Sequence, residues 1–179
     1  MVAISEQSQK FSVEKMTVDD VQPANELRLE SWIDTYVNDE LGITRRWIEV
    51  HNQDQNTVES NERRKIRLTH PNHAAWVAKD SSLKIIGLTT PFMDDEGVQH
   101  VGSLYVDKNW LGKGVGSALM QKVIDWSNTT KPIELHVVAY NERAIAFYQK
   151  WGFEMQAHYY ELFDDKIPEI MMIRKGDKQ

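Results

Sequence analysis

The spacing of apolar residues changes part-way along the chain, from helical spacing to the patterns typical of strands. In the first part, Trp32 and Tyr36 lie at helical spacing, in a segment that predicts a helix beginning at Thr17 or Asp19. Aspartate is a good residue to cap a helix start, and Gly42 interrupts the pattern. We therefore expect a long first helix that ends before Gly42.

The remaining N-terminal segments are short. The weak alternation over 11–15 predicts a first strand, and Thr44 is placed to cap a second helix that carries Trp47 and Ile48. Residues 53–65 are polar and charged, so a surface helix and a surface loop are both open alternatives there.

From Ala74 onward the pattern is that of a sheet interrupted by two helices. Turn residues such as Asp80 and Gly97 separate the apolar runs. Strands are expected over 74–79, 83–90, 98–106, 133–140, 154–162 and 169–174, and helices over 114–128 and 141–151. This order of elements predicts an α+β or mixed α/β fold in a single domain.

Composition and charge exclude several classes of protein. The 179 residues suit one domain, and no apolar run approaches the ~18 residues of a membrane span. The first residues lack the pattern of a signal peptide, so we expect a cytoplasmic protein with no membrane partner. The net charge of −6 argues against nucleic acid as a partner. The absence of cysteine excludes disulfides, cysteine zinc sites and a cysteine nucleophile.

Three glycines follow the strand expected over 98–106 and open the next helix. Gly112, Gly114 and Gly116 let the backbone approach a ligand closely, and the free N–H groups of a helix start favour an anion such as pyrophosphate. The spacing fits neither a Walker A loop, which needs Ser or Thr where Gly114 stands, nor a Rossmann fingerprint. The alternative is a tight turn that holds no ligand.

A second motif, Asn141-Glu-Arg-Ala-Ile-Ala-Phe-Tyr148, follows the strand expected over 133–140. Seven residues at ~100° each come within about 20° of two full turns, so Asn141 and Tyr148 share one helix face. Asn141 is also placed to cap this helix. A tyrosine phenol can protonate a leaving thiolate, and the alternative for Tyr148 is a core side chain.

Together, Leu111-Gly-Lys-Gly-Val-Gly116 and the segment 141–153 resemble the two signature motifs of the GCN5-related N-acetyltransferases, although Leu111 stands where that family usually has Arg or Gln. The resemblance implies a mixed, mostly antiparallel sheet flanked by helices. It also implies acetyl-CoA as co-substrate, Tyr148 as general acid, direct transfer of the acetyl group and no metal.

The resemblance further implies a single domain over 1–179, with a helical acceptor side over 11–73 and an acetyl-CoA-binding core over 74–175. For Lys113 and Arg143, a solvated surface charge is the alternative to a phosphate contact. The residues expected to contact acetyl-CoA are Leu104, Tyr105, Val106, Leu111, Gly112, Lys113, Gly114, Val115, Gly116, Ser117, Asn141 and Arg143.

Neither of the two motifs identifies the general base or the acceptor site. Many members of the family carry Glu eleven positions before the Arg or Gln of the loop, and counting back from Leu111 reaches His100. Because histidine titrates near neutrality, His100 is the expected base and His136 a second candidate. A strand histidine without a catalytic role is the alternative.

Trp32 and Tyr36 stand among acidic residues, which suits a cationic amine, although a solvated helix face is the alternative. This segment and Ala157-His-Tyr-Tyr160 are similar to bacterial polyamine acetyltransferases. We therefore expect a small-molecule amine acceptor, such as a polyamine. The alternatives are a protein N-terminal or lysine acetyltransferase and a non-catalytic acetyl-CoA-binding module. For the oligomeric state, the sequence leaves a homodimer as one alternative.

Overall fold

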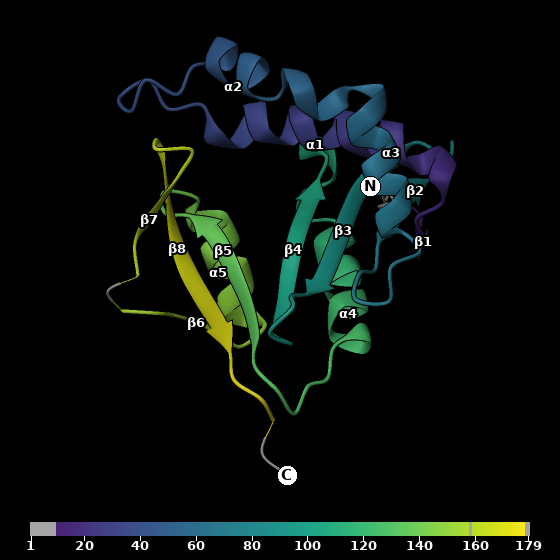
Figure 1. The fold of residues 1–179 in the computed structure, drawn as a ribbon, viewed down its shortest axis with the longest axis vertical. Coiled ribbons are helices and arrows are strands. Elements are labelled where there is room, and N and C mark those ends of the chain that lie inside the picture. The colour runs from purple at the N-terminus through teal and green to yellow at the C-terminus, as the bar shows by residue number, and fades with distance from the viewer. Residues whose placement is uncertain (1–9, 158, 178–179) are drawn as a thin grey trace, which may run out of the picture.

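The computed structural model describes residues 10–157 and 159–177, which form one sheet with helices on both faces (Figure 1). The strands are β1 (Phe11–Lys15), β2 (Trp76–Asp80), β3 (Ile85–Met93), β4 (Gln99–Val106), β5 (Ile133–Val138), β6 (Phe153–Met155), β7 (Glu161–Phe163) and β8 (Ile167–Arg174). The helices are α1 (Val21–Tyr36), α2 (Arg45–His51), α3 (Val58–Arg67), α4 (Val115–Trp126) and α5 (Glu142–Lys150), with short 3-10 helices η1 (Val18–Asp20), η2 (Gln53–Asn56) and η3 (Lys108–Trp110).

The described strands pair in the order β1-β2-β3-β4-β5-β8-β6, and β7 pairs with β8 beside this path. Within the described sheet, only β4 and β5 run in parallel, and every other pair is antiparallel. The expected mixed, mostly antiparallel sheet is therefore confirmed.

Alternate side chains of the central strands enter two different cores. Val77 of β2 packs with Leu27 of α1, whereas the next residue, Ala78, packs with Leu119 of α4. Figure 1 shows α4 and α5 behind the sheet, while α1 and α2 cross its upper end. Because both faces are covered, the strands contain continuous apolar runs in place of a strict alternation.

The chain enters α1 through a capped 3-10 turn. The backbone N–H and the hydroxyl of Thr17 each donate to the Asp20 carboxylate at 2.8 Å, and Lys79 of β2 pairs with the same carboxylate at 2.8 Å. Thr44 caps α2 as expected, because its hydroxyl accepts a hydrogen bond from the Trp47 N–H at 3.1 Å. Short polar side chains thus cap the 3-10 turn that leads into α1 and the start of α2.

The polar segment 53–65 contains a helix, which decides between the two alternatives left open by its composition. The Thr57 hydroxyl accepts a hydrogen bond from the Ser60 N–H and so caps α3. Glu59 then pairs with Arg63 one turn later. Capping and i,i+4 pairing stabilise a helix with little apolar surface.

The expected strand over 154–162 is wrong, because this stretch contains two short strands. Met155 of β6 pairs with Met172, and Glu161 of β7 pairs with Glu169 on the same strand β8. Five residues separate Met155 from Glu161, whereas only two separate Glu169 from Met172. A continuous ladder needs the same number of residues on both strands, so the extra residues between Met155 and Glu161 interrupt it.

The β4–β5 pair separates soon after it begins. Its register contains only Gln99 opposite Ile133 and His100 opposite Glu134. On the other side of β4, both Gly102 and Ser103 pair with Thr90 of β3, which is a bulge. Gly102 has φ +65°, and a Cβ there would lie 2.1 Å from the Thr90 carbonyl oxygen. The bulge bends β4 away from β5, so the two strands diverge toward α1 and α2 (Figure 1).

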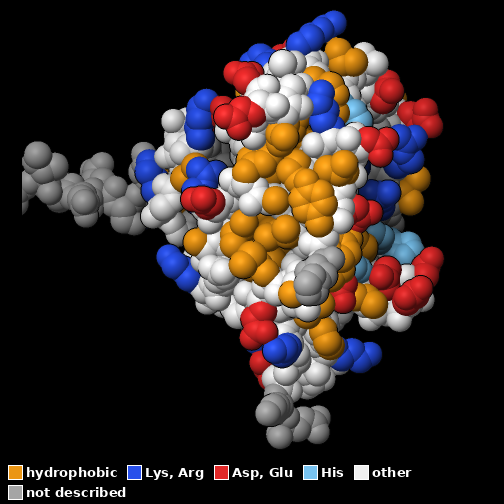
Figure 2. Space-filling model, turned by 90° about the vertical axis from the view of Figure 1, so that its left-hand side faces the viewer, with side chains coloured by type: hydrophobic (Ala, Val, Ile, Leu, Met, Phe, Trp, Pro, Cys, Tyr) orange, Lys and Arg blue, Asp and Glu red, His pale blue; other side chains and the backbone are white. Residues whose placement is uncertain are grey.

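Apolar side chains also gather on the outer face at the β6–β8 end of the sheet, as Figure 2 shows. Exposed apolar residues of this end include Met155, Tyr160 and Leu162. No helix among the described residues is long and apolar enough to cross a membrane.

Candidate functional site

A cavity of about 380 Å³ occupies the divergence between β4 and β5. Its walls come from both strands, from the glycine loop, from the starts of α4 and α5, and from the C-terminal half of α1. The lining residues are Ser31, Thr35, Tyr36, Gly102, Leu104, Tyr105, Val106, Trp110, Leu111, Gly112, Gly114, Gly116, Ser117, His136, Val137, Asn141, Arg143, Ala144, Phe147 and Tyr148. The two motifs identified in the sequence therefore form opposite walls of one cavity.

The glycine loop has the backbone conformation that its sequence requires. Gly112 has φ +74° and Gly114 has φ +86°, both in the left-handed region that favours glycine. Gly114 is the N-cap of α4, and no side chain caps this helix start. The first N–H groups of α4 thus have no intrahelical acceptor and lie beside the cavity, where an anion such as a pyrophosphate would accept from them.

Asn141 and Tyr148 both line the cavity, as their two-turn separation predicts. The Asn141 side chain caps α5 by accepting a hydrogen bond from the Ala144 N–H at 3.2 Å. Tyr148 is 8% exposed and packs edge-on against Phe153. Burial raises the pKa of the Tyr148 phenol, and the nearby Tyr105 raises it further. The phenol therefore stays protonated at neutral pH and can act as a proton donor.

Of the expected acetyl-CoA contacts, Lys113 and Val115 do not line the cavity. The Val115 side chain is fully buried against the core, which leaves its backbone N–H as the group that could meet a ligand. The Lys113 ammonium lies 5.3 Å from the centre of the Trp110 ring, at the outer side of the loop.

The structure does not bring His100 to this cavity. His100 stands at the last paired position of β4, before the strands diverge. Its ring stacks on Phe92 at 4.6 Å, and its Nε2 lies 3.0 Å from an Asp94 carboxylate oxygen.

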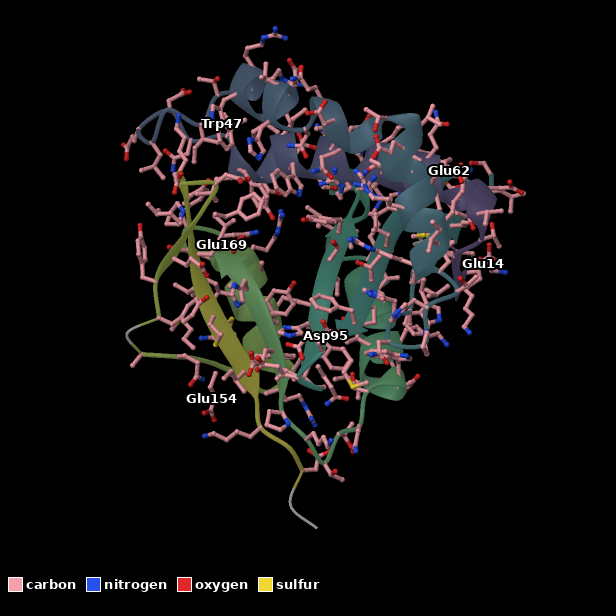
Figure 3. All side chains as sticks on the ribbon, viewed as in Figure 1. Glu14, Trp47, Glu62, Asp95, Glu154 and Glu169 are labelled. Atoms are coloured by element: carbon pink, nitrogen blue, oxygen red, sulfur yellow. The ribbon has the colours of Figure 1, made fainter. Side chains whose placement is uncertain are left out.

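His136 lies two positions past Glu134, the last residue of β5 that pairs with β4, and it does line the cavity. Its Nδ1 is 3.8 Å from the Glu169 carboxylate, and Tyr159 packs edge-on against its ring. Burial raises the pKa of Glu169 to about 7, and Glu161 and Asp164 add to this shift. In Figure 3, Glu169 lies at the end of β8 that faces α1 and α2.

The two expected acceptor residues have different places. Tyr36 lines the cavity, but Trp32 is 9% exposed and lies behind it. The indole Nε1 of Trp32 donates a hydrogen bond of 2.7 Å to the Tyr105 hydroxyl. Burial raises the pKa of Tyr105, so this hydroxyl also stays protonated.

Among the described residues, no carboxylate side chain lines the cavity. Asp34 pairs with Lys108 at 3.0 Å and lines another pocket, together with Glu30. Glu169 instead stands beside His136, with Glu161 and Asp164 near enough to raise its pKa.

Sequence reasoning missed several lining residues. Ser31 and Thr35 come from α1, and the buried Ser31 hydroxyl has no hydrogen-bond partner among the described residues. Glu169, which lies 3.8 Å from the lining residue His136, was missed as well. The i,i+4 spacing places Ser31 and Thr35 on one face of α1, but nothing in the sequence shows that this face meets β4. No group of three His, Asp or Glu side chains that could hold a metal occurs in the described part of the chain.

Comparisons with known proteins agree with the fold and the motifs. The sequence model of the Acetyltransferase (GNAT) family matches residues 30–153. An uncharacterized N-acetyltransferase of Methanocaldococcus jannaschii is 36% identical over 59 residues, which are 32% of this chain and 26% of that protein. The match thus spans about a quarter of that relative's length.

Solved structures share the fold at low sequence identity. A paia N-acetyltransferase from Thermoplasma acidophilum in complex with coenzyme A has a TM-score of 0.75 and 18% identity, over 93% of this chain and 99% of that one. A GCN5-related N-acetyltransferase from Kribbella flavida has a TM-score of 0.67 and 20% identity, over 92% and 97% of the two chains.

Proposed function

Because the chain belongs to the GNAT family of acetyltransferases, whose members act with acetyl-CoA, we propose that it transfers the acetyl group directly to the primary amine of a small molecule. The observation that carries the proposal is the cavity between β4 and β5. An uncapped helix start lies at one end of it, and Tyr148 and His136 line its walls.

The cavity walls fit an extended cofactor arm ending in a pyrophosphate. The N–H groups at the start of α4 would bind the pyrophosphate, and Lys113 and Arg143 are exposed cations near it. The backbone groups of 104–106 and the Asn141 side chain would bind the arm. Acetyl-CoA supplies an acetyl group activated as a thioester.

The chain's own groups would move two protons. The amine nitrogen attacks the thioester carbonyl, the C–S bond breaks, and Tyr148 gives its hydroxyl proton to the leaving sulfur. The attacking amine must lose a proton, and we assign its removal to His136, with the Glu169 carboxylate stabilising the imidazolium that forms. His100 was the first candidate on motif spacing, and the cavity favours His136.

Candidate acceptors include polyamines, because Glu169 stands 3.8 Å from His136 and could meet an ammonium group beside the cavity. The alternatives are a protein N-terminal or lysine acetyltransferase and a non-catalytic acetyl-CoA-binding module. Cytoplasmic location and a homodimer belong to the same proposal, and cell fractionation and gel filtration test them.

The test is release of free CoA thiol from acetyl-CoA in the presence of amine and peptide panels. The chain contains no cysteine, so a thiol reagent reports on CoA alone. Transfer to small amines supports the proposal, and transfer to peptides alone supports the protein-modifying alternative. Tight acetyl-CoA binding without transfer to any amine or peptide would identify a binding module.

A further inference from the structure

A second cavity, of about 390 Å³, lies between α1, α3 and the strands β3 and β4. It shares one lining residue, Gly102, with the cavity between β4 and β5. Three arginines line it, Arg28 from α1 and Arg64 and Arg67 from α3, and we call it the arginine pocket. In Figure 3, α3, which carries the labelled Glu62, lies on the other side of β4 from Glu169.

The arginine pocket has a concentrated positive charge without a matching carboxylate. Among the described residues, no carboxylate forms a salt bridge with any of its three arginines. Arg64 donates to the Gln55 carbonyl oxygen at 2.7 Å, and the Arg28 Nε donates to the Asn25 side chain at 2.9 Å. The Arg28 guanidinium also lies 5.5 Å from the centre of the Trp32 ring. All of these partners are neutral groups, so none of them brings a negative charge to the arginines.

The arginines also repel one another. Burial lowers the pKa of Arg64 to about 10, and the neighbouring Arg28 and Arg67 contribute to the shift. Burial, His70 and Arg67 likewise lower the pKa of His73, which lines the same pocket. In a chain of net charge −6, a half-buried cluster of this kind is costly unless an anion compensates it.

The arginine pocket and the cavity between β4 and β5 meet at Gly102, which lines both. On the far side of that cavity from the pocket's arginines, Glu169 stands 3.8 Å from the lining residue His136. A molecule reaching from the arginine pocket past Gly102 to His136 would therefore meet three arginines at one end and the His136–Glu169 pair at the other.

We propose that the arginine pocket binds a carboxylate or phosphate group of the acetyl acceptor, so that the acceptor is a small molecule with a primary amine at one end and an acidic group at the other. This inference rests on the acetyl transfer proposed above and narrows its substrate class. A polyamine has no acidic group and would place an ammonium against the arginines, so it should be a poor acceptor.

The first test compares acceptors that differ only in charge. The panel contains ω-amino carboxylates of increasing length, their neutral amides, aminoalkyl phosphates and a polyamine. For the wild-type protein we expect kcat/KM at least about tenfold higher for an acidic amine than for its amide, which is the scale of one lost charge-assisted hydrogen bond. The ratio of kcat/KM for the amino carboxylates to kcat/KM for the aminoalkyl phosphates tells which acidic group the pocket prefers.

The second test changes the pocket itself. Arg67 is exposed and forms no salt bridge among the described residues, so Arg67→Gln should fold normally. It should raise KM for acidic amines about tenfold or more, with the KM for acetyl-CoA and the rates with neutral amides unchanged. The matched control is Arg63→Gln on the same helix, because Arg63 pairs with Glu59 and lies outside the pocket. Arg28→Gln is the second variant, with its melting temperature as a check on folding.

A binding measurement does not depend on turnover. With saturating CoA present to occupy the pyrophosphate loop, inorganic phosphate should raise the melting temperature of the wild type and of Arg63→Gln, but not of Arg67→Gln. Equal kcat/KM for acids and amides, or a polyamine as the best acceptor, would overturn this inference and leave the transferase proposal intact.

Two further outcomes separate the proposals. Loss of acetyl-CoA affinity in Arg67→Gln would show that the pocket holds a phosphate of the cofactor, which also overturns the inference. If no amine is acetylated, the transferase proposal fails, and with it the inference about the acceptor.

Discussion

The Trp32 Nε1 of α1 donates a 2.7 Å hydrogen bond to the Tyr105 hydroxyl of β4, across 73 positions of sequence. The Tyr105 ring lines the cavity, whereas Trp32 lies behind it and packs edge-on against Tyr36 at 5.0 Å. This one contact ties α1 to the strand that bends away from β5. It explains how a residue outside the cavity can control the cavity's shape.

Trp32→Phe should remove this hydrogen bond while keeping an aromatic ring in the core. Leaving the buried Tyr105 hydroxyl without its donor costs about 1–3 kcal/mol of unfolding free energy. Urea denaturation of Trp32→Phe, Tyr105→Phe and the double variant measures the coupling, expected at about 1 kcal/mol. Additive effects of the two substitutions would contradict a direct energetic link.

Gly114→Val should abolish acetyl-CoA binding measured by calorimetry. The residue has φ +86°, and a valine there is strained, so the loop and the N–H groups that it orients must move. The control is Gly97→Val, at φ +81° in a turn remote from the loop, where a Cβ likewise meets no atom within 4 Å. The two variants should lose similar stability, and only Gly114→Val should lose binding. Unchanged affinity in Gly114→Val would remove the loop from the cofactor site.

Tyr148→Phe should lower kcat by about 10²-fold or more, with acetyl-CoA affinity nearly unchanged, because the variant lacks only the hydroxyl that protonates the leaving thiolate. Tyr160→Phe, at a tyrosine that is 66% exposed, is the control and should keep the wild-type rate. A Tyr148→Phe variant with the wild-type kcat would exclude this phenol as the acid.

The pH profile tests the assignment of His136 and Glu169. Since the pKa of Glu169 is raised to about 7, kcat/KM should rise with pH through that region and level off above it, as the pair becomes able to accept the amine proton. His136→Ala should lower kcat/KM at pH 7 by about 10²-fold and recover at high pH, where the amine arrives deprotonated. His100→Ala should keep the wild-type profile. If His100→Ala loses activity at pH 7 and His136→Ala does not, His100 is the general base.

Glu169 should also make the folded protein less stable as the pH rises. Its folded pKa of about 7 is higher than the value of about 4.3 for an unfolded glutamate. The folded state therefore binds the proton more tightly, and this stabilisation is present below about pH 4.3 and lost as the pH rises through 7. Glu169→Gln does not titrate, so its free energy of unfolding relative to wild type should increase from pH 5 to pH 8. A constant difference over that range would contradict the raised pKa.

Local signals in the sequence were enough to predict most elements and the cofactor side of the site. Thr44, Gly114 and Asn141 mark helix starts through their own chemistry, and all three lie where the sequence places them. The break between β6 and β7 was not predictable, because it depends on how many residues of β8 lie opposite, which is a property of pairing and not of the segment itself.

The choice between His100 and His136 shows the same limit. Both residues stand on neighbouring strands with similar local sequence, and motif spacing points to His100. They differ in their position relative to the end of the β4–β5 ladder. The last pair is His100 with Glu134, and His136 lies beyond it, where the two strands have separated. The place where the strands part depends on the bulge at Gly102, whose effect on a strand 30 residues away cannot be read from local pattern.

The early end of the β4–β5 ladder has a thermodynamic consequence. Past His100, β4 has no strand along its β5 side among the described residues, so an extended cofactor arm bound there would complete the sheet. Such an arm would bind only the folded chain, so a ligand at 100 times its Kd adds about 2.7 kcal/mol to the free energy of unfolding. Resistance of this chain to unfolding and proteolysis would thus vary with the supply of acetyl-CoA, and amide hydrogen exchange in 103–106 would slow as the cofactor concentration increases.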